Sequence, residues 1–456
     1  MIRDHQRERR FTIALAAALA GTLALSAATA VALRAFGASA ILTGHGAVAG
    51  TQGGTSTGPG SAGSAGGGGA SGGANHGQPA VSGSAGRVAT QGISGGVIHL
   101  GSIITQTGPG RSITMAHALV AWEKTINDAG GINGYKVSID IKDDQGNPDL
   151  GASQYRQLNE DEKVFAMVAE CAPVTDAQEV GYIRSSALPV VGECQSSPPA
   201  YSLPTLWVGG PTPYQNGVLG AEMMERIRNW PTTGGRIALV CLQDPSTSPV
   251  CDGVAHTYPS GALWHGGPQY EQITDNNYAQ LIAQWQSDGV QDVHLVLDPG
   301  SVQRYLYAAQ AAGFNPPTMN NLIVDDGDAG AYSNAEGMMI GTPWTPLDQS
   351  TPEMNRFTAA MHRYYPDDRV DLYAQTGWIS ALVLEHALRL MGGNITRQNL
   401  IDTLNGKVHG WDTQFGPVEN YTAQLHNGPL ESALMAVQGA GTAGWRLVTV
   451  HNAING

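Results

Sequence analysis

The chain has 456 residues, of which 42% are hydrophobic, and its 38 Asp and Glu outnumber its 24 Lys and Arg to give a formal net charge of −14. Such a composition is typical of a folded protein, and the acidic excess argues against a surface for nucleic acid or anionic lipid. The chain is also too long for one ordinary core, so two lobes are expected.

The N-terminal segment predicts a membrane anchor. Four arginines lie within the first ten residues, and Phe11–Leu33 then contains no charged residue. A helix of that length spans roughly 34 Å, enough to cross a bilayer core of about 30 Å. Basic residues before such a helix keep the N-terminus cytoplasmic. We therefore expect residues 1–42 to form a cytoplasmic tip and a transmembrane signal anchor, with the folded domain extracytoplasmic at the cell membrane.

A cleaved signal peptide is the alternative, with small-residue cleavage sites at Ala28-Thr29-Ala30 or Ala38-Ser39-Ala40. We favour the anchor because the apolar core of a signal peptide usually runs about 7–15 residues. Residues 43–96 are rich in Gly and Ser and contain almost no large apolar side chains. A segment of this kind cannot bury enough surface to fold, so we predict a disordered linker.

The folded part opens with a βαβ pattern. Val97–Ile104 is an apolar, strand-forming run that ends at a turn containing Gly108 and Gly110. Large apolar residues then recur at helical spacing, at Met115, Leu119, Trp122 and Ile126. A second strand follows, in which apolar and polar residues alternate from Val137 to Ile141. Such units pack into a parallel sheet with right-handed crossovers.

The sequence of this stretch resembles a known family. The resemblance rests on Thr107-Gly108-Pro109, the predicted helix that contains Met115 and Ile126, GGINGYK at residues 130–136 and DDQGNP at residues 143–148. The stretch is similar to the opening of type I periplasmic binding proteins, specifically the branched-chain amino-acid-type substrate-binding proteins of ABC transporters. The similarity covers most of Val97 to Arg446. It implies an α/β fold of two doubly wound, Rossmann-like lobes joined by a multi-strand hinge, with an ABC permease as partner.

The resemblance also implies domain boundaries. Lobe 1 is expected to comprise residues 97–209 and 345–415, and lobe 2 residues 210–344 and 416–456, with the hinge and a C-terminal tail. Strands are expected at Val164–Ala169, Leu188–Val191, Arg236–Val240, Val293–Leu297 and Asn321–Val324, and helices at Tyr278–Ser287, Ser301–Ala312, Pro352–Tyr364 and Tyr373–Met391. Loops at the carboxyl ends of such strands border the ligand crevice of doubly wound sheets.

The four cysteines predict two disulfides. Outside the cytoplasm an even number of cysteines favours disulfides over free thiols. Cys171 and Cys194 follow successive strands of lobe 1, and Cys241 and Cys251 bracket one loop of lobe 2. We expect the pairs Cys171–Cys194 and Cys241–Cys251. Metal binding is the alternative, but no clustered CxxC or neighbouring His supports it.

The resemblance assigns ligand-binding roles to particular positions. Asp326, with Asp325 as the fallback, matches the carboxylate that pairs with a ligand ammonium group. The groups that hold the ligand carboxylate match Ala172, Gln195 and Ser196, and the further candidates are Ser112, Tyr214 and Asp298. Ala172 stands where serine is usual, Gln195 replaces a small residue and Asp298 replaces an aromatic. These departures favour a ligand more polar than Leu, Ile or Val.

No catalytic chemistry is indicated. The sequence contains no H-E-x-x-H motif and no Walker A loop, and the acidic run from Asp325 to Asp328 lacks the later ligands of a calcium loop. We expect a binding protein without cofactor or metal, which closes over a small amino-acid-like ligand and delivers it to an ABC transporter. The alternative is a ligand-sensing receptor ectodomain of the same fold, and an enzyme on this scaffold is a third, less favoured reading.

Overall fold

The computed structural model describes residues 91–108, 111–172, 176–193, 198–244, 247–322, 333–416, 418–427, 431–437 and 445–452. The chain divides into two units, Met1–Ser82 and Gly83–Gly456, and every described element belongs to the second. Within this described part, no helix is both long and apolar enough to span a bilayer. The expected anchor at residues 11–33 and residues 43–90 of the expected linker lie outside the described residues. The predicted end of the linker at residue 96 is wrong, because Ile93–Ser94 forms strand β1 and pairs with the strand that starts at Val97.

The first sheet is built around the predicted βαβ unit. β2 (Val97–Ile103) pairs in parallel with β3 (Lys136–Lys142), and α2 (Ile113–Asp128) connects them. The path through the sheet runs β1-β2-β4-β5-β6, with β3 on β2, and β1 alone is antiparallel to its neighbour. The remaining strands are β1 (Ile93–Ser94), β4 (Ala166–Glu170), β5 (Val190–Glu193) and β6 (Leu206–Trp207). The predicted parallel βαβ unit is therefore confirmed.

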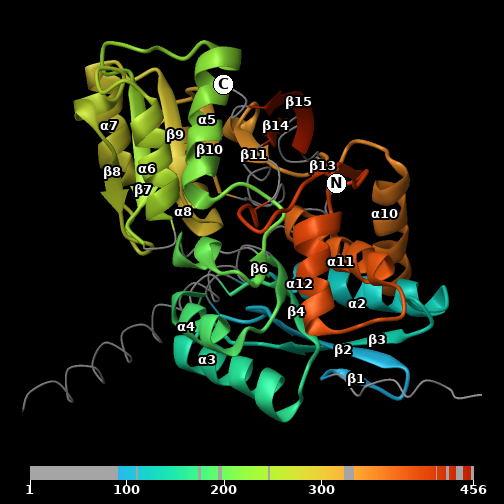
Figure 1. Cartoon of the computed structure of the whole chain (residues 1–456). Helices are drawn as coiled ribbons and strands as arrows, with labels where there is room; N and C mark the ends of the chain where they lie inside the picture. Colours follow the sequence, from blue (N-terminus) through green and yellow to red (C-terminus); the bar gives the residue numbers. More distant parts are fainter. Residues whose placement is uncertain are drawn as a thin grey trace, which may run out of the picture. The chain divides into compact units, whose positions relative to one another are not determined.

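Helices from two distant parts of the sequence cover the first sheet. Figure 1 shows α10 and α11, in orange, beside α2 in blue-green. The close approach of α11 to α2 requires a glycine, because a Cβ on Gly377 would lie 2.7 Å from the carbonyl oxygen of Met115. The helices of this lobe are α2, α3 (Pro148–Arg156), a π-helix (Gln157–Asp161), α4 (Asp176–Ser186), α10 (Pro352–Tyr364), α11 (Leu372–Met391) and α12 (Arg397–Lys407).

The second sheet has seven described strands in the order β15-β14-β11-β10-β9-β7-β8. The five strands from β11 to β8 are parallel, whereas β14 and β15 join antiparallel at one side. The strands are β7 (Ile237–Leu242), β8 (Gln269–Glu271), β9 (Asp292–Val296), β10 (Thr318–Asn320), β11 (Met339–Thr342), β14 (Glu431–Val437) and β15 (Trp445–Asn452). The helices are α5 (Pro213–Arg228), α6 (Ser248–Thr257), α7 (Tyr278–Asp288) and α8 (Pro299–Ala312).

The strand expected at residues 321–324 is shifted toward the N-terminus in the structure. β10 spans Thr318–Asn320 and starts directly after Pro317, which has no N–H to donate to a neighbouring strand. It ends where the Asn320 side chain bonds the backbone of Leu297, the residue after β9 (Asp292–Val296), donating to its carbonyl and accepting from its N–H, both at 3.1 Å. The apolar residues Leu322 to Val324 therefore suggested a strand three residues too late.

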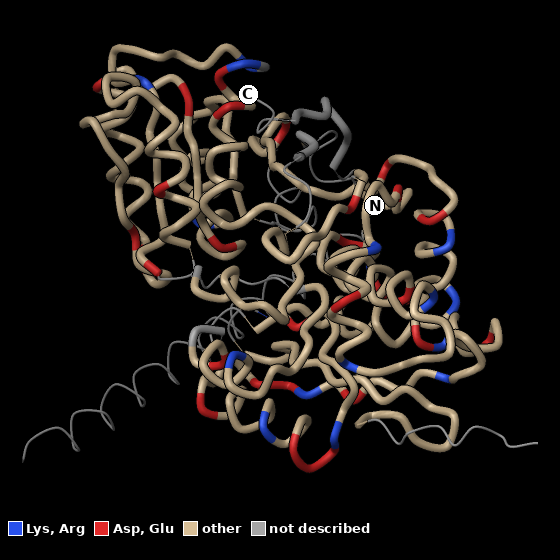
Figure 2. Tube along the Cα trace, in the orientation of Figure 1, with Lys and Arg blue, Asp and Glu red and all other residues tan. Residues whose placement is uncertain are grey.

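Three segments of chain connect the two sheets. The first leads from β6 to α5, the second from β11 to α10, and the third from α12 to β14 through the small hairpin of β12 (Trp411–Asp412) and β13 (Val418–Glu419) (Figure 1). Backbone hydrogen bonds tie them together, from Val208 N–H to the His426 carbonyl at 2.8 Å and from Thr345 N–H to the Phe415 carbonyl at 3.0 Å. Charged residues of both signs are scattered over both sheets and their helices (Figure 2).

Candidate functional site

The candidate ligand-binding residues lie at the carboxyl ends of parallel strands and at the helix starts beyond them. In lobe 1 these are the ends of β2 and β4, and in lobe 2 the end of β9 and the N-terminus of α5. In doubly wound sheets these loops form the binding edge. The local geometry at each position decides whether its polar groups are available to a ligand.

Two aspartates after β3 hold the loop that follows β2. Asp143 accepts hydrogen bonds from the N–H groups of Gln106 at 2.9 Å and Thr107 at 3.2 Å, and from the Thr107 hydroxyl at 2.6 Å. Asp144 accepts from the Thr105 hydroxyl at 2.7 Å. Burial by itself raises the pKa of Asp143, but the hydrogen bonds outweigh it and lower that pKa. The DDQGNP segment thus fixes the position of the loop after β2.

Ser112 follows that loop and caps α2. Its N–H donates to the Thr105 carbonyl at 2.8 Å, its side chain is only 3% exposed, and its Oγ has no hydrogen-bond partner among the described residues. The N-terminus of a helix carries partial positive charge, and α2 has no acidic residue in its first turn to offset it. A free hydroxyl at such a position can bind an anionic group such as a carboxylate.

Ala172 is fully buried at the end of β4. Next to it, Cys171 is bonded to the β2 segment, donating its N–H to Ile103 at 2.8 Å and accepting from the Thr105 N–H at 3.1 Å. Ala172 therefore lies close to the loop that leads to Ser112, although its methyl group offers no hydroxyl. Gln195 and Ser196, the other predicted carboxylate-binding residues, lie outside the described residues.

Tyr214 occupies the first turn of α5, directly after the first hinge crossing. The helix start is fixed by a capping box, in which Gln215 N–H donates to the Thr212 hydroxyl and Thr212 N–H to the Gln215 side chain. The Tyr214 ring is 40% exposed. Its carbonyl packs so closely on α6 that a Cβ on Gly253 would lie 2.1 Å away. The backbone at Tyr214 is therefore held firmly while the ring remains available to stack on a ligand.

Asp298 has a local structural role. One carboxylate oxygen accepts hydrogen bonds from the N–H groups of Gly300 at 2.9 Å and Ser301 at 3.2 Å, and the other accepts from the Ser301 hydroxyl. This is the N-cap of α8. Both oxygens are engaged, so a contact to ligand would have to share them. Asp325 and Asp326 lie outside the described residues, and their ligand role stays a prediction.

A buried polar network in lobe 2 was not found from the sequence. His294, in the middle of β9, is fully buried, with Nδ1 2.9 Å from the Tyr258 hydroxyl and Nε2 bonded to Asn321 Oδ1. The Asn321 side chain donates to the Asn216 carbonyl at 2.7 Å, and Asn216 donates back to the Asn321 carbonyl at 3.1 Å. The network thus connects β9 and the end of β10 to α5 at Asn216, two residues after Tyr214.

Burial keeps the histidine of this network neutral. Because an amide oxygen can only accept, Nε2 of His294 carries the proton, and Nδ1 of the neutral ring then accepts from the Tyr258 hydroxyl. Burial lowers the pKa of His294 to about 4, although its bond to Asn321 partly opposes this. The signal available in the sequence was a single histidine inside the otherwise apolar strand Val293–Leu297.

Disulfide-bonded cysteines are found in both lobes. A disulfide joins Cys241, at the end of β7, to Cys251 in α6, and α6 in turn packs against α5 at Gly253. Cys171 is also disulfide-bonded, and its predicted partner Cys194 lies outside the described residues. The first of these bonds thus fastens the helix on which α5 rests.

Comparison with known proteins decides the family. The family model described as periplasmic binding protein matches residues 97–443. The chain belongs to the periplasmic binding protein family. This confirms the resemblance to the branched-chain amino-acid-type substrate-binding proteins of ABC transporters, and with it the type I fold. A search of curated protein sequences found no match.

Solved structures of this periplasmic binding protein's fold include three that illustrate its range. A fatty acid ABC transporter substrate-binding protein from Thermomonospora curvata is 18% identical, with a TM-score of 0.72 over 81% of this chain and 96% of the other. A branched-chain amino acid ABC transporter protein from Thermus thermophilus with bound valine is 17% identical, with a TM-score of 0.69 over 78% and 97%. A solute-binding protein from Rhodopseudomonas palustris in complex with 3,4-dihydroxybenzoic acid is 13% identical, with a TM-score of 0.67 over 79% and 98%.

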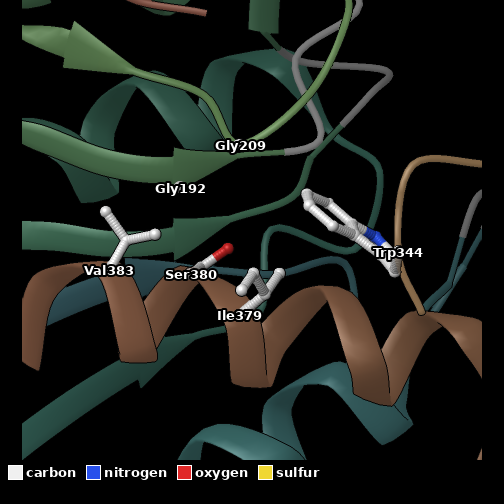
Figure 3. A pocket seen from close by; sticks show the side chains of 6 residues that line it. All are labelled: Gly192, Gly209, Trp344, Ile379, Ser380 and Val383. Atoms are coloured by element: carbon white, nitrogen blue, oxygen red, sulfur yellow. The ribbon is translucent and has the colours of Figure 1, made fainter. Parts of the chain in front are cut away.

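In this periplasmic binding protein, the hinge crossings pack on Trp344. Figure 3 shows its ring at the side of a small cavity, with Ile379, Ser380 and Val383 projecting from α11 toward the strands. The cavity measures about 10 Å3, room for one water molecule at most. The Trp344 indole N–H donates to the Thr376 hydroxyl at 3.3 Å. The cavity is therefore a feature of hinge packing and is too small for a ligand.

Proposed function

We propose that this protein captures a small, amino-acid-like ligand that carries a carboxylate, closes its two lobes over it and delivers it to an ABC transporter. The observation that carries the proposal is the buried hydroxyl of Ser112 at the N-terminus of α2, which has no hydrogen-bond partner among the described residues, in a chain of the periplasmic binding protein family. Hydroxyl and helix end together suit a carboxylate.

The bound molecules named for the similar structures support the carboxylate. Valine and 3,4-dihydroxybenzoic acid, and the fatty acid of the Thermomonospora curvata protein's name, all contain that group. They differ in the rest of the molecule, so they do not define what lies beyond it. The exposed ring of Tyr214 can pack on an apolar or aromatic portion. An ammonium group on the ligand would pair with the predicted Asp326.

Thermal unfolding of the full-length protein against a ligand panel tests the binding role. The panel contains amino acids, short fatty acids and aromatic acids, each beside the amide or methyl ester that lacks the negative charge. A ligand at about 100 times its Kd stabilises the folded state by about 2.7 kcal/mol. We expect some acids, and not their esters, to raise the Tm, and Ser112→Ala to abolish the rise while Ser153→Ala, an exposed serine of α3, keeps it. Equal shifts by acid and ester would contradict the carboxylate assignment.

We further propose that residues 1–42 anchor the protein in the cell membrane and that the folded domain works outside the cytoplasm. The uncharged Phe11–Leu33 segment after a basic N-terminus supports this. Membrane fractionation with alkaline carbonate extraction is the test. We expect the full-length protein to remain with the membrane and a chain lacking residues 1–42 to be released from it. Extraction of the full-length protein by carbonate would contradict the anchor.

Transport, as opposed to sensing, depends on the partner. Affinity capture of the ligand-bound protein from detergent-solubilised membranes should recover an ABC permease and its ATPase. Recovery of a kinase or cyclase in their place would favour the receptor role.

A further inference from the structure

The hinge contains a buried carboxylic acid that the ligand site does not use. Glu419, in β13, is fully buried, and neither of its carboxyl oxygens has a hydrogen bond of ordinary geometry among the described residues. The Tyr421 hydroxyl, also fully buried, interacts with the carboxyl group. A carboxylate without a cationic partner costs far more free energy to bury than the neutral carboxylic acid does.

The position of Glu419 relates it to all three crossings. It belongs to the third crossing itself. A Cβ on Gly209, in the first crossing, would lie 3.5 Å from Glu419 Oε1 and 3.0 Å from the Trp344 ring, which belongs to the second crossing. The Trp344 ring also lies against Gly416 of the third crossing, where a Cβ would be 3.1 Å from it. One residue from each connection thus meets at this point, so Glu419 cannot gain water without a change in how the crossings pack.

We propose that Glu419 is a proton-dependent switch of the hinge: as a neutral acid it holds the three crossings in the packed arrangement, and its ionisation loosens them. The switch needs no ligand, so it is independent of the proposed function. In a protein whose lobes close over a ligand, a loosened hinge lowers the population of the closed form, and the apparent affinity falls in proportion. That consequence alone rests on the proposed function.

The described surroundings of Glu419 provide no positive charge that would stabilise its ionised form. Burial raises its pKa to about 8, while the interaction with Tyr421 partly lowers it. The first crossing contributes Gly209 and the second Trp344, neither of which titrates, and the hairpin neighbour in register is Trp411. His426, the titratable group further along the third crossing, stacks on Trp207 at 4.9 Å between ring centroids. Among described residues, no Lys, Arg or His offsets a charge on Glu419.

The sign and range of the pH effect follow from these surroundings. In the packed hinge Glu419 keeps its proton up to about pH 8, and in an opened, hydrated hinge its pKa returns toward the ordinary 4.5. Between these values the opened hinge releases a proton that the packed hinge retains, so raising the pH favours opening by up to about tenfold per pH unit. Above about pH 8 both forms are ionised and the dependence ends.

Hydrogen exchange of the full-length, ligand-free protein tests the switch. The reporters are peptides containing Val208 and Thr345, whose N–H groups bond to the third crossing. After correction for intrinsic exchange rates, wild-type protection at these peptides should fall by up to about tenfold per pH unit between pH 5 and 8. Glu419→Gln, which mimics the neutral acid, should show constant protection. Constant protection in the wild type, or a Glu419→Gln profile that follows the wild type, would overturn the proposal.

Two further variants separate the switch from a general loss of stability. Tyr421→Phe removes the hydroxyl that favours the ionised form, so the upper end of the pH range should move to higher pH. Because Tyr421→Phe keeps Glu419, this variant tests whether Glu419 is the switch even if Glu419→Gln does not fold. Asp292→Asn is the matched control, because burial raises the pKa of Asp292 to about 6 within β9, away from the crossings. It should leave the hinge profile as in wild type, and an unchanged upper end in Tyr421→Phe would count against the switch.

Discussion

His294 offers the sharpest test of the second lobe's polar network. His294→Leu replaces the imidazole in β9 with an apolar side chain of similar size and removes both of its hydrogen bonds. The Tyr258 hydroxyl and the Asn321 amide oxygen would then be buried without a partner. Each such group costs about 1–3 kcal/mol, so for the two groups we expect a loss of about 2–6 kcal/mol in the free energy of unfolding at pH 7.

The pH dependence gives the prediction its specificity. The pKa of His294 is about 4 in the folded protein, against an ordinary value of 6.5. Between these values the unfolded chain binds a proton that the folded protein does not. The contribution of neutral His294 to the free energy of unfolding is therefore complete above about pH 6.5 and is lost as the pH falls to about 4. The loss is about 3 kcal/mol over the window. His294→Leu has no imidazole to titrate, so the difference in unfolding free energy between wild type and this variant should shrink by about 3 kcal/mol from pH 7 to pH 4.

Urea unfolding followed by circular dichroism at pH 7, 5.5 and 4 provides the measurement. Tyr258→Phe is the control, since it removes one hydrogen bond but keeps the titrating imidazole, and its pH dependence should follow the wild type. A stability difference between wild type and His294→Leu that is the same at pH 4 and pH 7 would refute the assignment of a neutral, buried histidine.

Three further substitutions test the helix contacts and the site. Gly253→Ala should lower the free energy of unfolding in urea by about 1–3 kcal/mol, because its Cβ would meet the Tyr214 carbonyl. Gly261→Ala is the control, since no atom lies within 4 Å of its Cβ. Equal effects of the two substitutions would contradict the close helix contact. Asp298→Ala should cost about 1 kcal/mol of unfolding free energy through loss of the α8 cap, and full stability with loss of ligand binding would instead assign it to the ligand. Ser112→Ala should leave stability within about 0.5 kcal/mol, since its Oγ has no described partner, and a larger loss would show that the hydroxyl is structural.

The sequence determined the local elements where several signals coincided. α10 was predicted with its observed bounds, and the structure shows why they hold: the Thr351 hydroxyl accepts from the Met354 N–H as the N-cap, and Pro352 occupies the first helical position. The βαβ unit at the start of lobe 1 was equally clear. Its helical spacing of apolar residues, the alternation of apolar and polar residues in its second strand and the glycines between these elements all lie in one short stretch of sequence. The pairing of Cys241 with Cys251 required only ten residues of separation.

Contacts between distant segments could not be read from the sequence. A histidine within an apolar strand gives no indication that Tyr258, Asn321 and Asn216 surround it, and β10 was placed too late because apolar residues continue past the asparagine that ends it. Glu419 lies in a short hairpin, and nothing in its local sequence indicates that it is buried. Its burial arises only when three crossings, separated by many residues, pack around Trp344. Periodicity and capping act over a few residues and determine the elements, whereas the protonation of Glu419 and His294 depends on desolvation, which only the tertiary structure decides.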